Sequence, residues 1–281
     1  MSTPSPEAAT PRRRGARVPL RTWRRGLTSL ARMLREHRPT AATSVLGAAR
    51  PERGGAVADI GPHTVGLAAD EGPWRPSARP RQGRLGDCWV MAAMLAVHET
   101  APERLQALIR RELDGTATVQ LPGADGPMRV ERTFPVGSTG GFVYGRQQGS
   151  GPGWVGVLEK AVAMQVAGGY RFLQRGLGRY GLQVLLGVRG RMLLRLPSAH
   201  QIVAWRAEHR AILASTHPLS GRVVTAHGRL PANHVFAVVG AEPGAGHLLL
   251  RNPWRPDDLL RIDARTFRRG FISVDVTPPL R

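Results

Sequence analysis

The spacing of apolar and polar positions predicts helices mainly in the first half of the chain and strands mainly in the second. Helices are expected at 88–97, within 100–113, at 154–169 and from Ser198 to about His209. Strands are expected within 117–145, at 191–196 and 211–216, in a hairpin over 234–254 that turns near 243–244, and around a short helix over 259–276. This order is typical of an α+β fold with two lobes.

Local signals mark several ends of these elements. Thr100 and Glu103 have the spacing of a capping box, which predicts a helix start there. Gly168 and Gly169 are expected to end the helix over 154–169, and Ser198 is a natural N-cap for the next one.

Residues 1–53 differ from the remainder of the chain. They contain 12 Arg and 3 Glu, a net charge of +9, with much Pro, Ser, Thr and Ala. One interpretation is a disordered tail. The other is a basic amphipathic helix for an anionic membrane or a partner protein, because apolar residues recur at helical spacing at Leu20, Trp23, Leu27, Leu30, Met33 and Leu34. Residues 54–72 are interpreted as a linker, and 73–277 as the globular domain.

Composition narrows the function classes. The net charge is +20, but the basic residues are spread along the chain and aromatic residues make up only 5%, so nucleic-acid binding is not expected. The single cysteine excludes an internal disulfide and a zinc site built from several cysteines. Neither a membrane-length apolar run nor the apolar core of a signal peptide is present. We therefore expect a cytoplasmic protein, with non-classical export left open.

Candidate chemistry centres on Cys88 in the stretch RQGRLGDCW. Gly86 and Asp87 precede the predicted helix, Asp87 as its natural N-cap, so the thiol should lie on the first turn. Unpaired N–H groups and the helix dipole favour an anion there, which predicts a lowered thiol pKa and a nucleophilic sulfur. The alternative is an inert, buried cysteine.

A thiolate nucleophile needs a base, an orienting group and oxyanion donors. Folding the hairpin about its turn brings His234 beside Asn252, whose amide oxygen can hold an imidazole N–H. Cys88 and His234 are 146 residues apart, within the ~130–150 of papain-like enzymes. The Cys88 N–H and the Gln82 side chain are candidate oxyanion donors, and Trp254 can cover the histidine contact. Each of these residues also has an ordinary structural interpretation.

These stretches resemble the calpain-type cysteine proteases, whose nucleophile motif has the form of QGRLGDCW in this chain. HVFAVVGA and LLLRNPW resemble the strands that carry the histidine and asparagine of that family. GWVGVLEKAVA and LGRYGLQVLLG resemble segments that lie between the two motifs. The resemblance covers roughly residues 73–277, and Asp87, where papain has serine, makes calpain the closer relative.

The resemblance implies a papain-like fold with the catalytic cleft between a helical lobe, about 73–187, and a β-rich lobe, about 188–277. It assigns Cys88 as nucleophile, His234 as general base and acid, and Asn252 as the group that orients the imidazole. Gln82 would serve the oxyanion hole, and Trp254 would shield the triad. We expect a monomeric endopeptidase that cleaves protein or peptide substrates through a thioester acyl-enzyme. The alternatives are a silent peptide-binding module, or an acyl transferase or deamidase with the same residues.

This chain differs from the calpain-type family in the loops that bind calcium in that family. The family binds calcium through clustered acidic residues in loops of each lobe, but residues 73–86 contain no acidic residue. The loop after Asn252 offers only Asp257 and Asp258 as candidate metal ligands. We therefore expect no required cofactor, with calcium implied by resemblance alone.

Overall fold

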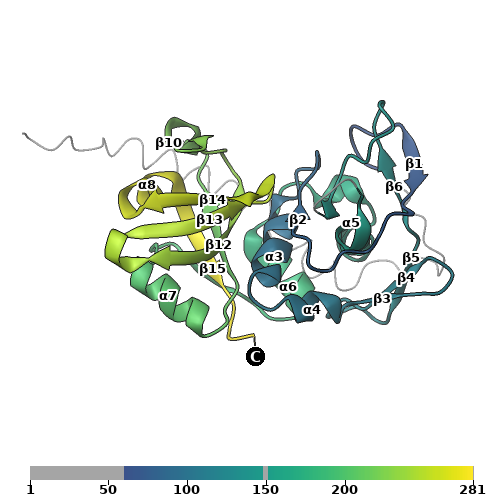
Figure 1. Cartoon of the computed structure of the whole chain (residues 1–281), viewed down its shortest axis with the longest axis horizontal. Coiled ribbons are helices and arrows are strands. Elements are labelled where there is room, and N and C mark those ends of the chain that lie inside the picture. The colour runs from purple at the N-terminus through teal and green to yellow at the C-terminus, as the bar shows by residue number, and fades with distance from the viewer. Residues whose placement is uncertain (1–59, 148–150, 281) are drawn as a thin grey trace, which may run out of the picture. The chain divides into compact units, whose positions relative to one another are not determined.

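The computed structural model describes residues 60–147 and 151–280 (Figure 1). These residues contain both helices and sheets, which confirms the predicted α+β class. We call residues 60–187 the helical part and residues 188–280 the sheet part. The predicted tail over 1–53 lies outside the described residues, as does the first part of the predicted linker.

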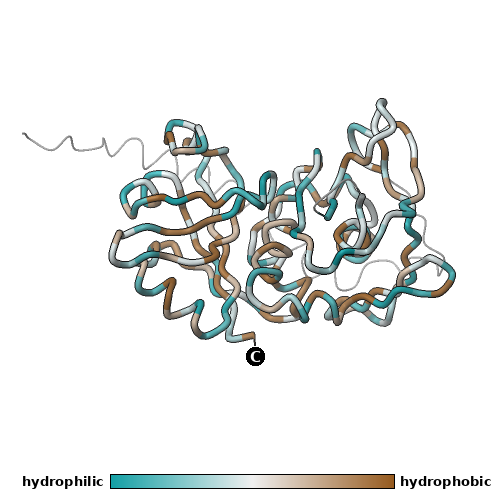
Figure 2. The backbone as a smooth tube through the Cα atoms, viewed as in Figure 1, coloured by the Kyte–Doolittle hydropathy of each residue, from teal (hydrophilic) through white to brown (hydrophobic). Residues whose placement is uncertain are grey.

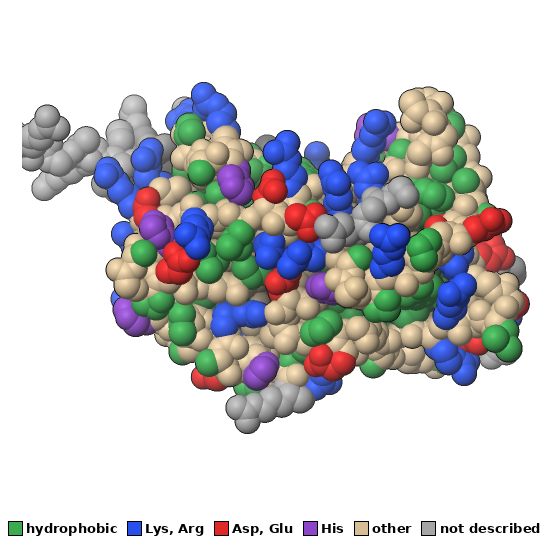
Figure 3. All heavy atoms as spheres, in the orientation of Figure 1, with side chains coloured by type: hydrophobic (Ala, Val, Ile, Leu, Met, Phe, Trp, Pro, Cys, Tyr) green, Lys and Arg blue, Asp and Glu red, His purple; other side chains and the backbone are tan. Residues whose placement is uncertain are grey.

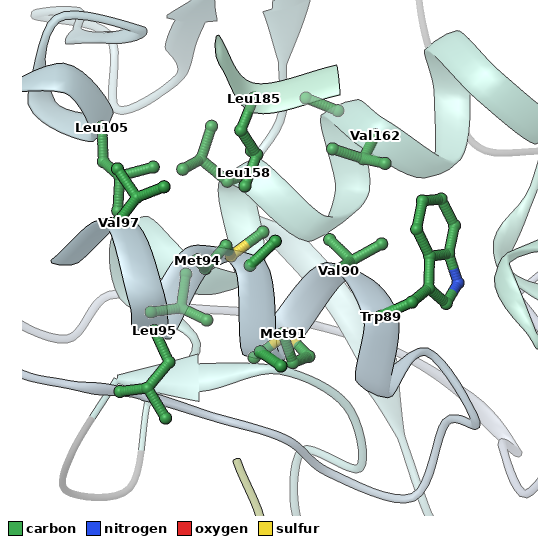
Figure 4. Close-up of a cluster of buried hydrophobic side chains, with 14 of the residues drawn as sticks. Trp89, Val90, Met91, Met94, Leu95, Val97, Leu105, Leu158, Val162 and Leu185 are labelled. Atoms are coloured by element: carbon green, nitrogen blue, oxygen red, sulfur yellow. The ribbon is translucent and has the colours of Figure 1, made fainter. Parts of the chain in front are cut away.

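The helical part is built around α3 (Cys88–His98). All of its residues from Cys88 to Val97 are buried, because an apolar helix on every side needs partners on every side. Those partners are α4 (Pro102–Gln106), α5 (Gly153–Val162), which continues as a π-helical turn (Ala163–Ala167), a 3₁₀ turn (Tyr170–Leu173) and α6 (Gly178–Leu186). Figure 4 shows side chains of α3 meeting Leu158 and Val162 of α5 and Leu185 of α6.

Gly181 allows α6 to lie directly on α3. A Cβ at this position would lie 2.3 Å from the Trp89 carbonyl oxygen, so a larger residue would force the two helices apart. Gly168 ends the helix that begins with α5 in the left-handed region at φ 68°, as the sequence predicted.

Three small sheets surround these helices. β1 (Gly66–Ala69) pairs with β6 (Thr133–Val136), and β2 (Pro80–Arg81) pairs with β7 (Arg146–Gln147). The third contains β3 (Ile109–Arg111), β4 (Ala117–Val119) and β5 (Met128–Val130). Because β1 is paired and Asp70 is buried, residues 66–70 belong to the folded part and not to a linker.

The predicted helix over 100–113 is largely wrong. α4 has only five residues and follows Ala101, without a side-chain cap. The Thr100 hydroxyl instead donates to the Ala96 carbonyl at 2.6 Å. Residues 109–111 form β3, because pairing with β4 across a tight turn satisfies their backbone groups.

The sheet part is dominated by one antiparallel sheet in the order β14-β13-β12-β9-β15-β8. Its strands are β8 (Arg191–Leu193), β9 (Ile212–Thr216), β12 (Val235–Glu242), β13 (His247–Asn252), β14 (Arg255–Asp263) and β15 (Phe271–Val276). It is joined by α7 (Ala199–Ala207), α8 (Ala264–Gly270) and a two-stranded ribbon of β10 (Val224–Thr225) and β11 (Gly228–Arg229). The predicted hairpin is confirmed as β12 and β13, and Ser198 accepts the capping hydrogen bond from the Gln201 N–H.

Two buried hydrophobic clusters meet at β12. Val235 and Ala237 belong to the cluster of the helical part, whereas Phe236 and Val238 belong to the cluster of the sheet part. This division follows from the alternation of side chains along a strand. Figure 2 shows hydrophobic stretches running along both α3 and the strands of the large sheet. The start of β12, which directly follows His234, therefore lies at the junction of the two clusters.

The structure bears on two expectations from the sequence, one about a membrane-spanning segment and one about the distribution of basic residues. None of the helices within 60–147 and 151–280 has the length and apolar character needed to cross a bilayer. On the face seen in Figure 3, Lys and Arg side chains are distributed over both parts of the molecule, with acidic side chains among them.

Candidate active site

Cys88 is the first residue of α3, as predicted, and the residue is 9% exposed. The Asp87 carbonyl oxygen begins the helix by accepting hydrogen bonds from the N–H groups of Val90 and Met91 at 2.8 and 3.2 Å. The Asp87 side chain, however, makes no capping hydrogen bond. It is fully buried and turns inward toward Glu159, so its predicted role as a side-chain cap is wrong.

The electrostatic environment of the thiol also differs from the prediction. Burial raises the pKa of Cys88 to about 11, and the negative charge of Asp87 acts in the same direction. Backbone hydrogen bonding, mainly from Val235, acts in the opposite direction but is the smaller effect. Desolvation of the charged form thus outweighs the helix N-terminus, and the predicted lowering of the pKa is wrong for the free protein.

The same contact shows where Cys88 lies in the fold. Val235 is the first residue of β12 and directly follows His234. Its backbone lowers the pKa of Cys88, and α3 packs on β12, so the first turn of the helix lies near the beginning of this strand. Two segments that are far apart in sequence, one beginning with Cys88 and the other directly following His234, are therefore packed together.

His234 and Asn252 form the contact that the hairpin predicted. The imidazole Nε2 lies 2.9 Å from Asn252 Oδ1, and the Trp254 N–H donates to the same oxygen at 3.0 Å. An atom that receives a backbone N–H must be the amide oxygen, so the neutral imidazole carries its hydrogen on Nε2. Nδ1 is then left with the lone pair that can accept a proton.

Aromatic rings enclose the imidazole. The Trp254 ring lies over it with centroids 4.1 Å apart, and Phe236 approaches edge-on at 5.2 Å. Trp254 itself is 43% exposed, so it stands between the histidine and solvent. Burial lowers the pKa of His234 to about 4, against the smaller opposite effect of the Asn252 hydrogen bond.

Gln82 is buried and connects the nucleophile segment to the asparagine turn. Its backbone N–H donates to the Pro253 carbonyl at 2.8 Å, directly after Asn252. Its side-chain Nε2 donates to the Leu85 carbonyl at 2.7 Å, which uses one of the two amide hydrogens. The arrangement brings Gln82, Asn252 and Trp254 to one region and leaves the second amide hydrogen for another acceptor.

The two candidate calcium ligands do not form a cluster. Asp257 and Asp258 are consecutive residues of β14, whose side chains point to opposite faces of the strand. Asp257 Oδ1 lies 3.4 Å from the Arg79 guanidinium. Among the described residues, no group of three or more His, Cys, Asp or Glu side chains has an arrangement suited to a metal ion.

The sequence interpretation missed an ion-pair network at the other end of α3. The Glu99 carboxylate contacts the guanidinium groups of Arg79 and Arg251, and the Glu99 carbonyl accepts from Arg206 at 2.6 Å. Arg206 lies on α7 and Arg251 on β13, next to Asn252. The network therefore ties the end of the helix that begins with Cys88 to the hairpin that carries His234. No local sequence signal connects residues this far apart.

The comparisons with known proteins identify the family of this chain. The family model for calpain family cysteine proteases matches residues 77–258, a span that includes Cys88, His234 and Asn252. The chain therefore belongs to the calpain family of cysteine proteases.

Curated relatives with similar sequences include the calpain-type cysteine protease ADL1 of Oryza sativa subsp. japonica, at 28% identity over 190 residues. The calpain-type cysteine proteases DEK1 of Arabidopsis thaliana and of Zea mays match at 27% over 190 residues. Each match covers 62% of this chain but only 9% of the relative, so the chain corresponds to a small portion of these proteins.

Proposed function

We propose that this chain is a cysteine endopeptidase that hydrolyses peptide bonds through Cys88, His234 and Asn252. The observation that carries the proposal is the Asn252 amide oxygen, which accepts from both His234 Nε2 and the Trp254 N–H. These two bonds fix the tautomer in which Nδ1 can take a proton from a nucleophile. Membership of the calpain family supports the same assignment.

In the proposed reaction, the Cys88 sulfur attacks the peptide carbonyl carbon while His234 Nδ1 takes the thiol proton. The oxyanion that forms accepts hydrogen bonds from the Cys88 N–H and from Gln82 Nε2. Collapse breaks the C–N bond, and the imidazolium gives its proton to the leaving amine. Water, deprotonated by His234, then attacks the thioester and releases the carboxylic acid and the thiol.

The pKa values of Cys88 and His234 indicate the protonation states of the two side chains in the free protein, before substrate binds. With the pKa of Cys88 at about 11 and that of His234 at about 4, both groups are neutral at pH 7 in the free protein. A neutral pair implies that proton transfer from sulfur to nitrogen accompanies substrate binding or attack. Trp254 supports this step because it limits water at the imidazole.

We infer further that the helical and sheet parts are the two lobes of a papain-like fold, with the substrate held where they meet. Two separate buried clusters, joined at β12, support this interpretation. The nucleophile then comes from one lobe, and the histidine and asparagine come from the other.

Product analysis tests the proposal against its alternatives. A peptide substrate should yield two shorter peptides whose masses sum to that of the substrate plus one water. Release of ammonia would indicate a deamidase, and joined peptides would indicate an acyl transferase. A chain that neither cleaves peptides nor reacts with a peptide carrying a thiol-directed electrophile would be a binding module.

Asn252→Ala should lower kcat by about tenfold to a hundredfold, comparable to loss of an outer-shell histidine partner, and leave KM nearly unchanged. The alanine removes the acceptor that fixes the imidazole, without altering residues that would hold substrate. Steady-state kinetics on a fluorogenic peptide measure both constants. Asn252→Asp, which keeps an acceptor oxygen, should retain more activity than the alanine variant. Equal kcat in wild type and Asn252→Ala would restrict Asn252 to a structural role.

Gln82→Ala should lower kcat by about 10²-fold, which is the usual cost of losing one oxyanion donor. The matched control is Gln106→Ala, because Gln106 is exposed on α4 and should change neither constant. The same kinetic assay distinguishes two roles for Gln82. A rise in KM at constant kcat would assign it to substrate binding instead.

Calcium should have little effect on this chain, because the residues present do not fit the ion. Ca²⁺ takes six to eight oxygen ligands, often carboxylates. The segment before Cys88 offers arginines instead, and Asp257 already faces Arg79. Peptidase activity should persist in EGTA, and calcium titration should leave the Tm unchanged. Activity lost in EGTA and restored by added calcium would contradict this prediction.

A further inference from the structure

Three arginine residues lie together beside Gln82, the candidate oxyanion donor. Arg81 on β2 is directly opposite Arg146 on β7 in the antiparallel register. Arg84 lies on the turn that follows β2, and its N–H donates to the carbonyl of Val143, shortly before β7, at 2.7 Å. Two segments distant in the chain thus bring these three residues to one region of the helical part. We call Arg81, Arg84 and Arg146 the arginine cluster.

No carboxylate neutralises the arginine cluster. Within residues 60–147 and 151–280, no acidic side chain lies at ion-pair distance from any of its three members. The Nε of Arg146 is buried and has no hydrogen-bond acceptor among these residues. Arg79, on the same segment just before the cluster, does have acidic partners, Glu99 and Asp257. The cluster therefore keeps its positive charge, whereas its neighbour in sequence is neutralised.

The charges of the arginine cluster act against one another. Like charges directly opposite on paired strands are destabilising, as Arg81 and Arg146 are here. Burial lowers the pKa of Arg146, and the positive charges of Arg81 and Arg84 lower it further. An anion among the three guanidinium groups would relieve this repulsion. A carboxylate suits the place well, because it matches a guanidinium group in both charge and geometry.

The arginine cluster lies where a bound substrate would pass. In the proposed reaction, the substrate carbonyl lies between the Gln82 side chain and the Cys88 N–H. Gln82 is buried, whereas Arg81 and Arg84 on either side of it are exposed. Consecutive Cα atoms are about 3.8 Å apart, so the Cα atoms of Gln82 and Arg84 are within about 8 Å of each other. An extended peptide advances about 3.3 Å per residue, so substrate side chains within about three positions of the cleaved bond come within reach of the cluster.

We propose that the arginine cluster is a substrate subsite that selects peptides with aspartate or glutamate close to the cleaved bond. The position of that bond rests on the proposed function, and the subsite deepens it by naming acidic peptides as the substrate class. A peptide is favoured over a nucleic acid as the anionic partner, because the cluster directly flanks Gln82, the group that would hold a substrate carbonyl. Binding of an acidic peptide at the cluster does not itself require cleavage.

Peptide binding to the full chain carrying Cys88→Ala tests the subsite without any cleavage. The probes are two fluorescently labelled peptides of equal length, one with alternating Glu and Ala and one with every Glu replaced by Gln. Fluorescence anisotropy should show tighter binding of the acidic peptide, and this advantage should shrink as added NaCl screens the charges. Equal affinities for the two peptides at low salt would overturn the proposal.

Replacing single arginines in the same Cys88→Ala chain shows where the acidic peptide binds. Arg84→Gln should reduce the ratio of the two peptide affinities by about two- to fivefold, the size expected for an ion pair open to solvent. Arg81→Gln and Arg146→Gln should each act in the same direction. The matched control is Arg191→Gln, which removes an equal charge from an exposed position of β8, the edge strand of the large sheet in the sheet part. An equal loss in this control would indicate a response to net charge alone and would overturn the proposal.

Charge reversal separates the role of charge from that of side-chain packing. Arg84→Glu should reduce the preference for the acidic peptide more than Arg84→Gln does, because the new carboxylate repels the peptide and pairs with the remaining arginines. Arg84→Lys, which keeps the charge, should retain most of the preference. If the Gln, Glu and Lys variants lose the preference equally while remaining folded, the charge of Arg84 does not select the peptide and the proposal is wrong.

Cleavage by the chain with its cysteine intact tests the consequence for substrate selection. Starting from a peptide that the chain cleaves, each position near the cleaved bond is changed in turn to Glu or to Gln, and kcat/KM is compared. Glu should be favoured over Gln at one or more of these positions, and Arg84→Gln should reduce that selectivity whereas Arg191→Gln should not.

The two sets of measurements distinguish failure of the subsite from failure of the proposed function. A chain that binds the acidic peptide through the cluster but cleaves no peptide would refute the proposed function and leave the acidic-peptide subsite. A chain that cleaves peptides with no preference for Glu at any position would refute the subsite alone. Tighter binding of a labelled single-stranded DNA than of the acidic peptide, lost in the same arginine variants, would assign the cluster to nucleic acid and overturn the proposal.

Discussion

Cys88→Ala should abolish peptide hydrolysis and leave the fold intact. The chain contains no other thiol, so no second sulfur can replace this nucleophile. The substitution removes one buried atom and keeps the Cβ and the backbone N–H, so α3 should pack as before. Activity should fall by about 10⁴-fold or more, as it does when a nucleophile is removed from a catalytic triad. Fluorogenic-peptide kinetics and thermal unfolding measure the two expectations on the same preparation.

A binding measurement serves as the control for Cys88→Ala, because it separates loss of catalysis from loss of substrate binding. Cys88→Ala should still bind a peptide that the wild type cleaves, since the residues around the sulfur remain. Fluorescence anisotropy with a labelled peptide measures this binding directly. Residual hydrolysis near the wild-type rate would remove the proposed mechanism, because no other step supplies a covalent acyl-enzyme.

The candidate site could be predicted from the sequence where local patterns determine it. The apolar run after Asp87 required a buried helix, and strand alternation around a Gly and Pro turn required a hairpin. The hairpin then brought His234 to Asn252, which the 2.9 Å contact confirms. Each of these inferences depended on residues near one another in sequence, or on the symmetry of a single hairpin.

What the sequence could not predict depends on residues that are distant in the chain. Asp87 has the residue type of an N-cap, but Glu159, 72 positions later, lies where its side chain turns inward. The depth of burial of Cys88, set by packing against β12, then decides the direction of its pKa shift. The helix expected over 100–113 failed for a related reason, because pairing between β3 and β4 outweighed local helix signals.

His234→Gln should lower peptide hydrolysis by about 10⁴-fold or more, and unlike Cys88→Ala it should keep the reactive sulfur. Glutamine is uncharged and close in size to histidine, and it can still donate to Asn252. It cannot exchange a proton between sulfur and a leaving amine. Iodoacetamide should therefore still alkylate Cys88 in this variant, whereas Cys88→Ala should not be labelled at this position. Mass spectrometry identifies the labelled residue, and hydrolysis at the wild-type rate would exclude His234 as the base.

The same variant should change the response of stability to acid. Burial lowers the pKa of His234 from 6.5 to about 4, so between these values the unfolded chain binds the proton more readily than the folded one. The contribution to stability is complete above pH 6.5 and is lost as pH falls toward 4, a change of about 3 kcal/mol. Asp87 and Asp275 have raised pKa values and act in the opposite sense over part of this range, in both proteins. The difference in unfolding free energy between wild type and His234→Gln, measured with urea from pH 7 to 4, isolates the histidine. A difference that stays constant with pH would show that the imidazole is accessible to protons in the folded state.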